Sequence, residues 1–228
     1  MGGAPRVGVV GDIAELASYY ADPPHGVRAN MIFSADGAAA FTGRAGPLSC
    51  PTDQRLLRIL RGFADVVLVG AGTARAENYG PVRLTDTQRA TPPPIAVVSR
   101  TGELPSRLFS DPGQPPILVT CARSPADLGD DPRRRILVAG EDSVDLARAV
   151  ALLRARGMDR ILCEGGPTLL DELVEADAVA EICVTLAPKL AGHQPVGSRR
   201  PSALPVPVEM RLEHALAYDD YVFLKYRR

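Results

Sequence analysis

The chain has 228 residues, of which 46% are hydrophobic and 23% are charged, with 26 basic and 27 acidic side chains. This composition is typical of a globular protein with a sizeable core and excludes a largely disordered chain. A formal net charge of −1 provides no basic field for a nucleic-acid backbone, and no apolar run approaches the ~20 residues of a membrane-spanning helix. We therefore expect neither nucleic acid nor membrane as a partner.

Cysteines and histidines are few and scattered along the chain. The four cysteines, at positions 50, 121, 163 and 183, form no CxxC pair, and the three histidines form no HxxxH pattern. No apolar segment of a secretory signal follows the N-terminus. We expect reduced thiols in a cytoplasmic protein, and no metal bound by protein side chains.

The first 26 residues predict an N-terminal extension. Asp12 can cap a short helix over residues 13–20, which ends at Asp22-Pro23-Pro24. Residues 27–228 are then expected to form one domain.

The next elements alternate between strands and helices. VRANMIF at 27–33 predicts a strand, and a helix follows from Pro51, with Asp53 in its first turn. The apolar stripe of this helix is Leu56, Leu57, Leu60 and Phe63. DVVLVG at 65–70 is a nearly continuous apolar strand, typical of a sheet that is covered on both faces.

A long polar loop is expected at 71–93, after which short buried strands dominate. Strands are predicted at 94–99, 116–120, 135–139, 160–163 and 181–187, helices at 143–156 and 167–176, and an antiparallel pair within 207–226. The pattern predicts an α/β domain with a mixed, mostly parallel central sheet, flanked by helices and closed by C-terminal antiparallel strands.

Two glycine-containing segments follow predicted strands. VGAGTAR contains Gly70, Gly72 and Thr73, and CEGGPTLL places Gly165 and Gly166 before a helix. Glycines at such positions let backbone N–H groups approach an anion, and a helix N-terminus adds positive potential. Each segment alone can also be an ordinary turn. Two of them in one sheet suit a ligand with several phosphates, such as a dinucleotide.

Polar side chains near these segments are candidates for chemistry. Glu164 precedes the glycine pair, where it can do acid–base work on a substrate, cap a helix or form a salt bridge. Asn30 and Ser34 lie at the edge of the first predicted strand, and Asp36 begins a turn. Arg61 can complement a helix dipole or bind a phosphate.

The ordered motifs resemble those of a known family. SADG, LRGFADVVLVGAGTARAENYGPVR, PIAVVSRTGELP, ILCEGGPTLL and EICVTLAPKLAG are similar to motifs of the riboflavin-pathway pyrimidine reductases, the reductase half of bacterial bifunctional deaminase–reductases. The resemblance covers residues 27–226 and implies a dihydrofolate-reductase-like fold and a homodimer. It also implies NADPH-dependent reduction of the ribosyl group of 5-amino-6-ribosylamino-pyrimidinedione 5′-phosphate to a ribityl chain.

The resemblance also implies roles for single residues. The cofactor would be bound by Gly70, Gly72, Thr73, Ser99, Arg100, Gly165, Gly166 and Leu169, with Ser99 and Arg100 near the adenosine 2′-phosphate. The catalytic residues would be Glu164 and Asp36. The phosphorylated substrate would be bound by Asn30, Ser34, Ser49, Arg61 and Arg83, with the two arginines at its phosphate.

Some positions depart from the family pattern. Asn30 stands where the bacterial members carry a lysine, and Glu77-Asn78-Tyr79 replaces Asp-Asn-Pro or Asp-Asp-Pro. The zinc motif of the deaminase half, H-x-E…P-C-x-x-C, is absent, so deamination is expected in a separate protein. Two alternatives stay open: a reductase of the same fold acting on dihydrofolate or another heterocycle, and a nucleotide-binding module without turnover.

Overall fold

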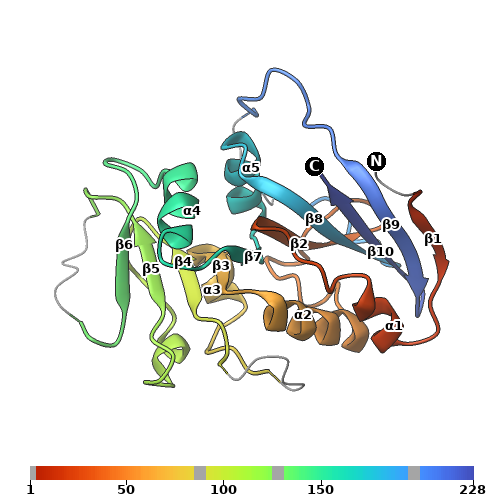
Figure 1. The fold of residues 1–228 in the computed structure, drawn as a ribbon, viewed down its shortest axis with the longest axis horizontal. Helices are drawn as coiled ribbons and strands as arrows, with labels where there is room; N and C mark the ends of the chain where they lie inside the picture. Colours follow the sequence, from red (N-terminus) through yellow and green to blue (C-terminus); the bar gives the residue numbers. More distant parts are fainter. Residues whose placement is uncertain (1–3, 85–90, 125–130, 195–200) are drawn as a thin grey trace.

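Parallel strand pairing organises the protein, for which a computed structural model describes residues 4–84, 91–124, 131–194 and 201–228. Within these residues, ten strands form one sheet in the order β1-β9-β10-β8-β2-β7-β3-β4-β5-β6 (Figure 1). They are β1 (Arg6–Val9), β2 (Gly26–Ser34), β3 (Val66–Gly70), β4 (Ile95–Val98), β5 (Ile117–Thr120), β6 (Arg135–Val138), β7 (Arg160–Cys163), β8 (Val179–Ala187), β9 (Arg211–Tyr218) and β10 (Tyr221–Arg227). Strand β10 runs antiparallel to β8 and β9, whereas the other described pairings are parallel.

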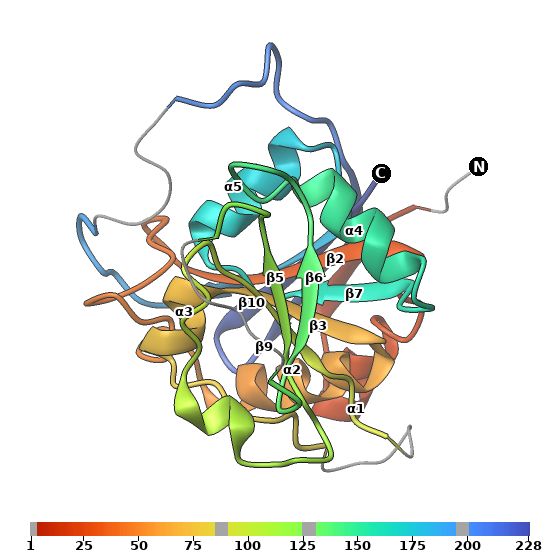
Figure 2. The same cartoon turned by 90° about the vertical axis from the view of Figure 1, so that its left-hand side faces the viewer.

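Helices cover both faces of this sheet. They are α1 (Ile13–Ser18), α2 (Pro51–Phe63), α3 (Ala71–Ala76), α4 (Leu146–Arg154) and α5 (Pro167–Glu175), with a 3-10 turn, η1, at Ser106–Phe109. Figures 1 and 2 show α4 and α5 on one face and α1 and α2 on the other. The sequence prediction of an α/β fold with a mostly parallel sheet and C-terminal antiparallel strands is confirmed.

Alternating side chains of the central strands pack into two separate hydrophobic cores, one on each face of the sheet. In β3, Val67 and Val69 face the α1–α2 side, whereas Val66 and Leu68 face the α4–α5 side. This period of two follows from the pleat of a strand that is buried on both faces. Helix α2 begins at a proline after Cys50, whose Sγ accepts a hydrogen bond from the backbone N–H of Asp53.

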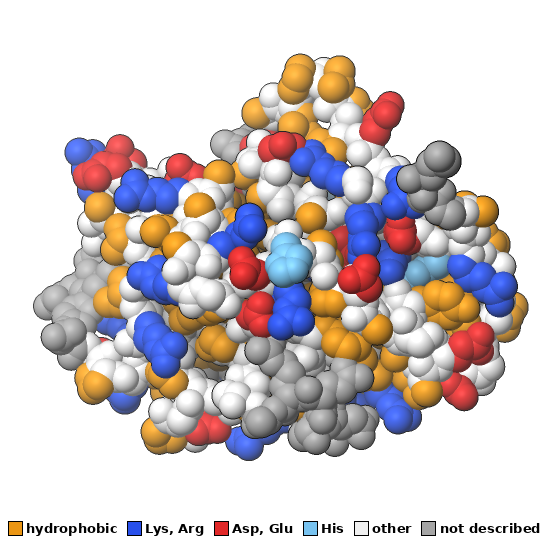
Figure 3. Space-filling model, in the orientation of Figure 1, with side chains coloured by type: hydrophobic (Ala, Val, Ile, Leu, Met, Phe, Trp, Pro, Cys, Tyr) orange, Lys and Arg blue, Asp and Glu red, His pale blue; other side chains and the backbone are white. Residues whose placement is uncertain are grey.

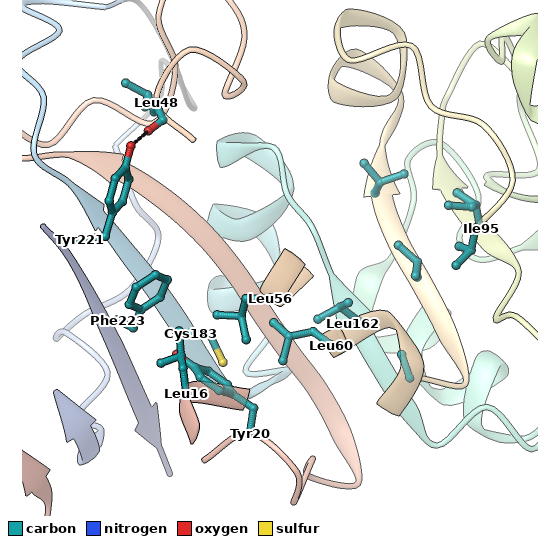
Figure 4. Close-up of a cluster of buried hydrophobic side chains, with 14 of the residues drawn as sticks. Leu16, Tyr20, Leu48, Leu56, Leu60, Ile95, Leu162, Cys183, Tyr221 and Phe223 are labelled. Atoms are coloured by element: carbon teal, nitrogen blue, oxygen red, sulfur yellow. Dashed lines mark hydrogen bonds between the residues drawn. The ribbon is translucent and has the colours of Figure 1, made fainter. Parts of the chain in front are cut away.

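The core on the α1–α2 side joins the N-terminal helix to the C-terminal hairpin. Leu16 and Tyr20 pack there with Leu60 of α2 and Phe223 of β10 (Figure 4). All four are 1% exposed or less, and burial of each such side chain contributes about 2 kcal/mol. The N-terminal segment is therefore part of the same core as the sheet.

Buried cationic side chains donate hydrogen bonds to the backbone of the N-terminal segment at Tyr19 and Tyr20. Arg28 of β2 donates from Nη1 to the carbonyl of Tyr20 at 2.9 Å and also pairs with Glu181 of β8. Lys225 of β10 donates to the carbonyl of Tyr19. The backbone of the N-terminal segment thus provides acceptors for cations that the sheet buries.

The structure differs from the sequence prediction in three places. Residues 6–9 form β1, which needs the distant β9 as its partner and has no local signal of its own. Helix α3 occupies the start of the loop expected at 71–93, because it begins directly at the glycine that ends β3. Residues 85–90 of that loop lie outside the described residues. The helix expected at 143–156 is shorter, because Asp145 caps it.

The order of the strands creates a crevice at their carboxyl ends. The chain passes from β3 outwards to β6 and then returns through α4 to β7, which lies between β2 and β3. Helix α3 leaves β3 and α5 leaves β7 at neighbouring points of the same sheet edge. Ligands of open α/β sheets bind at such switch points.

Candidate functional site

Two cavities adjoin at the carboxyl ends of β3, β4 and β7. The larger has a volume of about 880 Å³ and the smaller about 360 Å³. Residues that line both are Gly43, Thr73, Ala76, Gly166 and Pro167. A ligand in one cavity would therefore lie next to a ligand in the other, beside these shared residues.

Two helix N-termini open towards the larger cavity. Gly70 and Gly166 are the N-caps of α3 and α5, and neither helix has a side-chain cap. A Cβ added at Gly72 would meet nothing within 4 Å, and Gly72 lines the cavity, so a side chain there would occupy ligand space. This cradle of glycines and uncapped amides fits the diphosphate of a dinucleotide.

The two glycine segments predicted from the sequence also contact each other. The backbone N–H of Gly70 donates to the carbonyl of Gly165 at 2.8 Å. A Cβ added at Gly166 would lie 2.4 Å from Oγ1 of Thr73. Only a glycine at position 166 allows this approach of α5 to α3. Leu169 also lines the larger cavity.

Cations and hydroxyl groups lie at the end of this cavity near β4. Arg75, Ser99, Arg100 and Thr101 line it. Ser99 is 4% exposed, and its Oγ accepts a hydrogen bond from the backbone N–H of Gly102 at 3.1 Å, which shapes the turn after the strand. Two guanidinium groups beside a hydroxyl-bearing turn suit a phosphate ester.

Glu164 occupies the smaller cavity, where two other side chains hold its carboxylate. Arg61 donates from Nε to Oε1 and from Nη2 to Oε2, each at 2.7 Å. The hydroxyl of Tyr79 donates to Oε2, also at 2.7 Å. The side chain of Glu164 is 3% exposed, so these bonds stabilise a buried carboxylate that would otherwise be costly.

The same cluster shifts the pKa values of its donors. Burial and the charge of Glu164 raise the pKa of Tyr79 well above its ordinary value. Burial opposes the charge of Arg61, but the neighbouring carboxylate outweighs it and raises the pKa of Arg61. Tyr79 therefore stays protonated and Arg61 stays charged, so both keep donating to Glu164.

Further polar groups line the smaller cavity. They are Asn30, Ser49, Asp53, Gln54 and Glu77. Ser49 donates from Oγ to Oδ2 of Asp53 at 2.6 Å. Glu77 accepts the backbone N–H of Ala45 at 2.7 Å and thereby fastens the loop that covers this cavity.

Four of the residues predicted for the site lie outside the lining of both cavities: Ser34, Asp36, Arg83 and Gly165. Asp36 is exposed, and its carboxylate accepts hydrogen bonds from the hydroxyl of Ser34 and from the backbone N–H groups of Ala191 and Gly192. These bonds, that of Ser34 first, lower the pKa of Asp36 to about 2. Ser34 is buried in this turn, and Arg83 is exposed elsewhere. Asp36 thus joins two loops outside the lining of these two cavities, and its catalytic role stays a prediction.

The remaining predicted residues come together, and the structure adds others. Asn30, Ser49, Arg61 and Glu164 line the smaller cavity as expected. Asp53 and Tyr79 were not predicted as site residues. Asp53, Leu57 and Arg61 are spaced by four residues on α2, so helical spacing from Arg61 alone could have indicated Asp53. Tyr79 had no such signal, because it lies in a segment expected to be loop.

A parallel α/β sheet whose strand ends hold a dinucleotide-sized cavity beside a smaller polar one has the arrangement of a two-ligand reductase domain. Comparison with known families makes this specific. The model of the RibD C-terminal domain matches residues 25–224, and the chain belongs to this family. The family expected from the sequence motifs is thus confirmed.

Individual relatives agree with this assignment. The 2,5-diamino-6-ribosylamino-4(3H)-pyrimidinone 5′-phosphate reductase of Methanothermobacter thermautotrophicus is 28% identical over 177 residues, which cover 72% of this chain and 77% of that protein. RibD of Mycobacterium tuberculosis is 28% identical over 163 residues, 70% of this chain and 41% of that protein. A pyrimidine reductase-like protein from Corynebacterium diphtheriae has a similar structure, with a TM-score of 0.75, 27% identity and coverage of 92% and 93% of the two chains.

Among the described residues, the side chains outside these two cavities contain neither of two other kinds of site, metal centres and membrane spans. In the part of the chain that the structure describes, no three His, Cys, Asp or Glu side chains are grouped as metal ligands, and no helix has the length and apolarity to cross a membrane. All four cysteines are free thiols. Figure 3 shows acidic and basic side chains interspersed over one face of the molecule.

Proposed function

We propose that this protein is an NADPH-dependent reductase that converts the ribosyl group of a ribosylamino-pyrimidine 5′-phosphate into a ribityl chain. The observation that carries the proposal is the position of Glu164. Its carboxylate lies in the smaller cavity, next to Gly166, which also lines the larger cavity. A substrate beside Glu164 would therefore adjoin a dinucleotide bound along the glycine segments.

The larger cavity supplies the groups that NADPH needs. The uncapped N-termini of α3 and α5 suit its diphosphate. Arg100 and Ser99, after β4, suit the adenosine 2′-phosphate, and Arg75 adds a second cation. When bound, NADPH supplies the hydride, and the chain supplies position and charge.

The smaller cavity supplies a proton carrier. Opening of the sugar moves a proton from the glycosylic nitrogen to the ring oxygen, and reduction adds hydride to C1′ and a proton to that nitrogen. Glu164 can carry the first proton from the nitrogen to the ring oxygen, and the second proton, which the nitrogen gains during reduction, comes from solvent. Arg61 uses Nε and Nη2 for Glu164. Its Nη1 makes no hydrogen bond to a described residue and can bind a substrate anion.

The experiment is to follow the near-ultraviolet absorbance of NADPH with the purified protein. Oxidation with a ribosylamino-pyrimidine 5′-phosphate, and none with dihydrofolate, is the expected result. Oxidation only with dihydrofolate would contradict the proposal, as would binding of NADPH without any oxidation. The Methanothermobacter relative is a ribosylamino-pyrimidinone 5′-phosphate reductase and the Corynebacterium protein is pyrimidine reductase-like, which favours the first outcome over both alternatives. The homodimer and the separate deaminase stay predictions.

A further inference from the structure

The two oxygens of the Glu164 carboxylate are held unequally. A carboxylate has about four acceptor positions, two on each oxygen. Arg61 takes one position on Oε1 with Nε and one on Oε2 with Nη2, and the hydroxyl of Tyr79 takes the second position on Oε2. Among the described residues, no donor takes the second position on Oε1. Glu164 therefore keeps one open acceptor position, and it belongs to Oε1.

Tyr79, which fills the position on Oε2, is fixed by several contacts. Its backbone N–H donates to the carbonyl of Ala74 in α3 at 2.9 Å. Its ring packs against the core on the α1–α2 side, and Cζ of Arg61 lies 5.6 Å from the ring centroid. Burial and the charge of Glu164 raise the pKa of Tyr79 well above its ordinary value, so the hydroxyl stays a donor.

We propose that Tyr79 is a positioning residue of the reaction, which keeps Glu164 ionised and leaves Oε1 as the oxygen that carries the proton. In the opening of the sugar, Oε1 takes the proton of the glycosylic nitrogen. The electron pair of that nitrogen forms the C1′=N bond while the C1′–O bond breaks. Oε1 then gives the proton to the ring oxygen, so Glu164 ends this step ionised. The inference rests on the proposed function and adds a residue to its mechanism.

Other titratable groups near Glu164 have different partners. Asp53 of α2 and Glu77 at the end of α3 line the same cavity. Their hydrogen bonds to described residues go to Ser49 and to the loop at 44–45. Cys163 precedes Glu164 in the chain, and burial raises the pKa of its thiol to about 12. Loss of the Tyr79 hydroxyl therefore acts directly on Glu164.

The test is the pH profile of kcat in Tyr79→Phe, which loses the hydroxyl and keeps the ring. Without this donor the ionised carboxylate is less stable, so it takes up a proton at higher pH. We expect the acid limb of the profile to move to higher pH by about one pH unit or more, as for one hydrogen bond to a charged group. On the alkaline side of the limb, kcat should stay close to that of the wild type.

The matched control is Tyr226→Phe. Tyr226 is also half-buried, and it lies on β10 outside the lining of both cavities, so this variant should keep the wild-type profile. The protein is held at neutral pH and mixed into each assay buffer, so that acid acts on turnover and not on folding. An acid limb of Tyr79→Phe at the wild-type pH would overturn the inference, even if kcat were lower at every pH.

A crystal structure with the ribitylamino product tests the choice of oxygen. The nitrogen that bears the ribityl chain should lie within hydrogen-bond distance of Oε1 of Glu164. Contact with Oε2, or with neither oxygen, would contradict the inference. If Tyr79→Phe does not fold, 3-fluorotyrosine at position 79 keeps the hydroxyl and strengthens it as a donor. The acid limb should then move to lower pH, and an unmoved limb would count against Tyr79.

Failure of the proposed function has a separate signature. If the wild-type protein reduces no ribosylamino-pyrimidine, the proposed function fails, and infrared titration then decides the role of Tyr79. The band of a protonated carboxyl group that is missing in Glu164→Gln belongs to Glu164. This band should appear at higher pH in Tyr79→Phe than in the wild type, and its appearance at the same pH would refute the inference.

Discussion

Arg61 and Glu164 form a two-pronged ion pair across 103 positions of the chain, with Nε–Oε1 and Nη2–Oε2 distances of 2.7 Å each. The pair joins α2 to the carboxyl end of β7, so it also fixes the helix face that lines the smaller cavity. A guanidinium and a carboxylate in this geometry hold each other's orientation as well as charge. The orientation of Glu164 thus depends on a residue of another element.

Replacement of Arg61 by lysine tests this dependence. Arg61→Lys keeps the positive charge but removes the paired donors. We expect kcat to fall by about tenfold to a hundredfold, because the carboxylate can rotate. The Kd for NADPH, measured by fluorescence titration, should change little. A normal kcat in Arg61→Lys would show that charge alone is sufficient.

Replacement of Glu164 by glutamine tests the proton carrier. Glu164→Gln is nearly isosteric, so NADPH binding should stay close to that of the wild type. Turnover should fall by about a hundredfold or more, as for removal of a general acid–base group. Steady-state kinetics and cofactor titration separate the two effects. An equal loss of cofactor binding would place Glu164 in the cofactor site instead.

Arg100 is expected to select between the two nicotinamide cofactors. Arg100→Ala removes a cation that lines the larger cavity after β4, and we expect the Kd for NADPH to rise about tenfold or more. The Kd for NADH should change by less than about threefold, since it lacks the 2′-phosphate. Arg123→Ala, at an exposed residue outside this lining, is the control. An unchanged ratio of the two Kd values would assign the 2′-phosphate to another residue, with Arg75 as the next candidate.

The contact between Thr73 and Gly166 predicts a steric effect on the cofactor site. A Cβ at position 166 would lie 2.4 Å from Oγ1 of Thr73, so Gly166→Ala requires the Thr73 side chain to rotate or the start of α5 to shift. We expect destabilisation of about 1–3 kcal/mol together with weaker NADPH binding. Thr73→Ala in the same chain should recover part of the stability, measured by denaturant unfolding. A double mutant without any recovery would mean that the clash is relieved elsewhere.

His214 predicts an acid-sensitive step in stability. Burial, and then the charges of Lys225 and Arg28, lower the pKa of His214 from its ordinary 6.5 to about 4. The unfolded chain therefore takes up a proton below pH 6.5, whereas the folded chain does so only near pH 4. The stability that neutral His214 contributes is fully present above pH 6.5. As the pH falls from 6.5 to about 4, the free energy of unfolding decreases by up to about 3 kcal/mol.

The measurement is denaturant unfolding across this pH range. His214→Phe should remove most of the decline, because the phenyl ring cannot take up a proton and can keep the edge-on contact with Tyr20. His25→Gln, an exposed histidine, is the matched control and should leave the decline in place. A decline of the same size in His214→Phe would assign the acid sensitivity to carboxylates.

The elements that the sequence predicted best are those defined by local patterns. The apolar strand that became β3, the proline start of α2 and the two glycine segments needed only their neighbours in the chain to be recognised. Their meeting at one sheet edge followed from parallel pairing. The lining of the larger cavity could therefore be outlined from the sequence.

Residues whose partners lie far along the chain could not be assigned in this way. Asp36 accepts backbone N–H groups of Ala191 and Gly192, 155 and 156 positions away, and its motif gives no hint of them. Asp53 stands where helices commonly carry an acid, so its sequence position looked structural. Its helical spacing from Arg61 was a local signal, but its place in the lining of the smaller cavity is seen only in three dimensions.

The N-terminal segment belongs to the packed core although it lies outside the residues that the family model matches. Family similarity covers residues 25–224, but the carbonyls of Tyr19 and Tyr20 receive Lys225 and Arg28. A protein cut to the limits of the family model would lose Lys225 at one end and Tyr20 at the other, and the buried Arg28 would keep Glu181 but lose the carbonyl of Tyr20. The residues that complete the packing of this fold therefore extend beyond those that the family model matches. The N-terminal segment and the last strand complete it together.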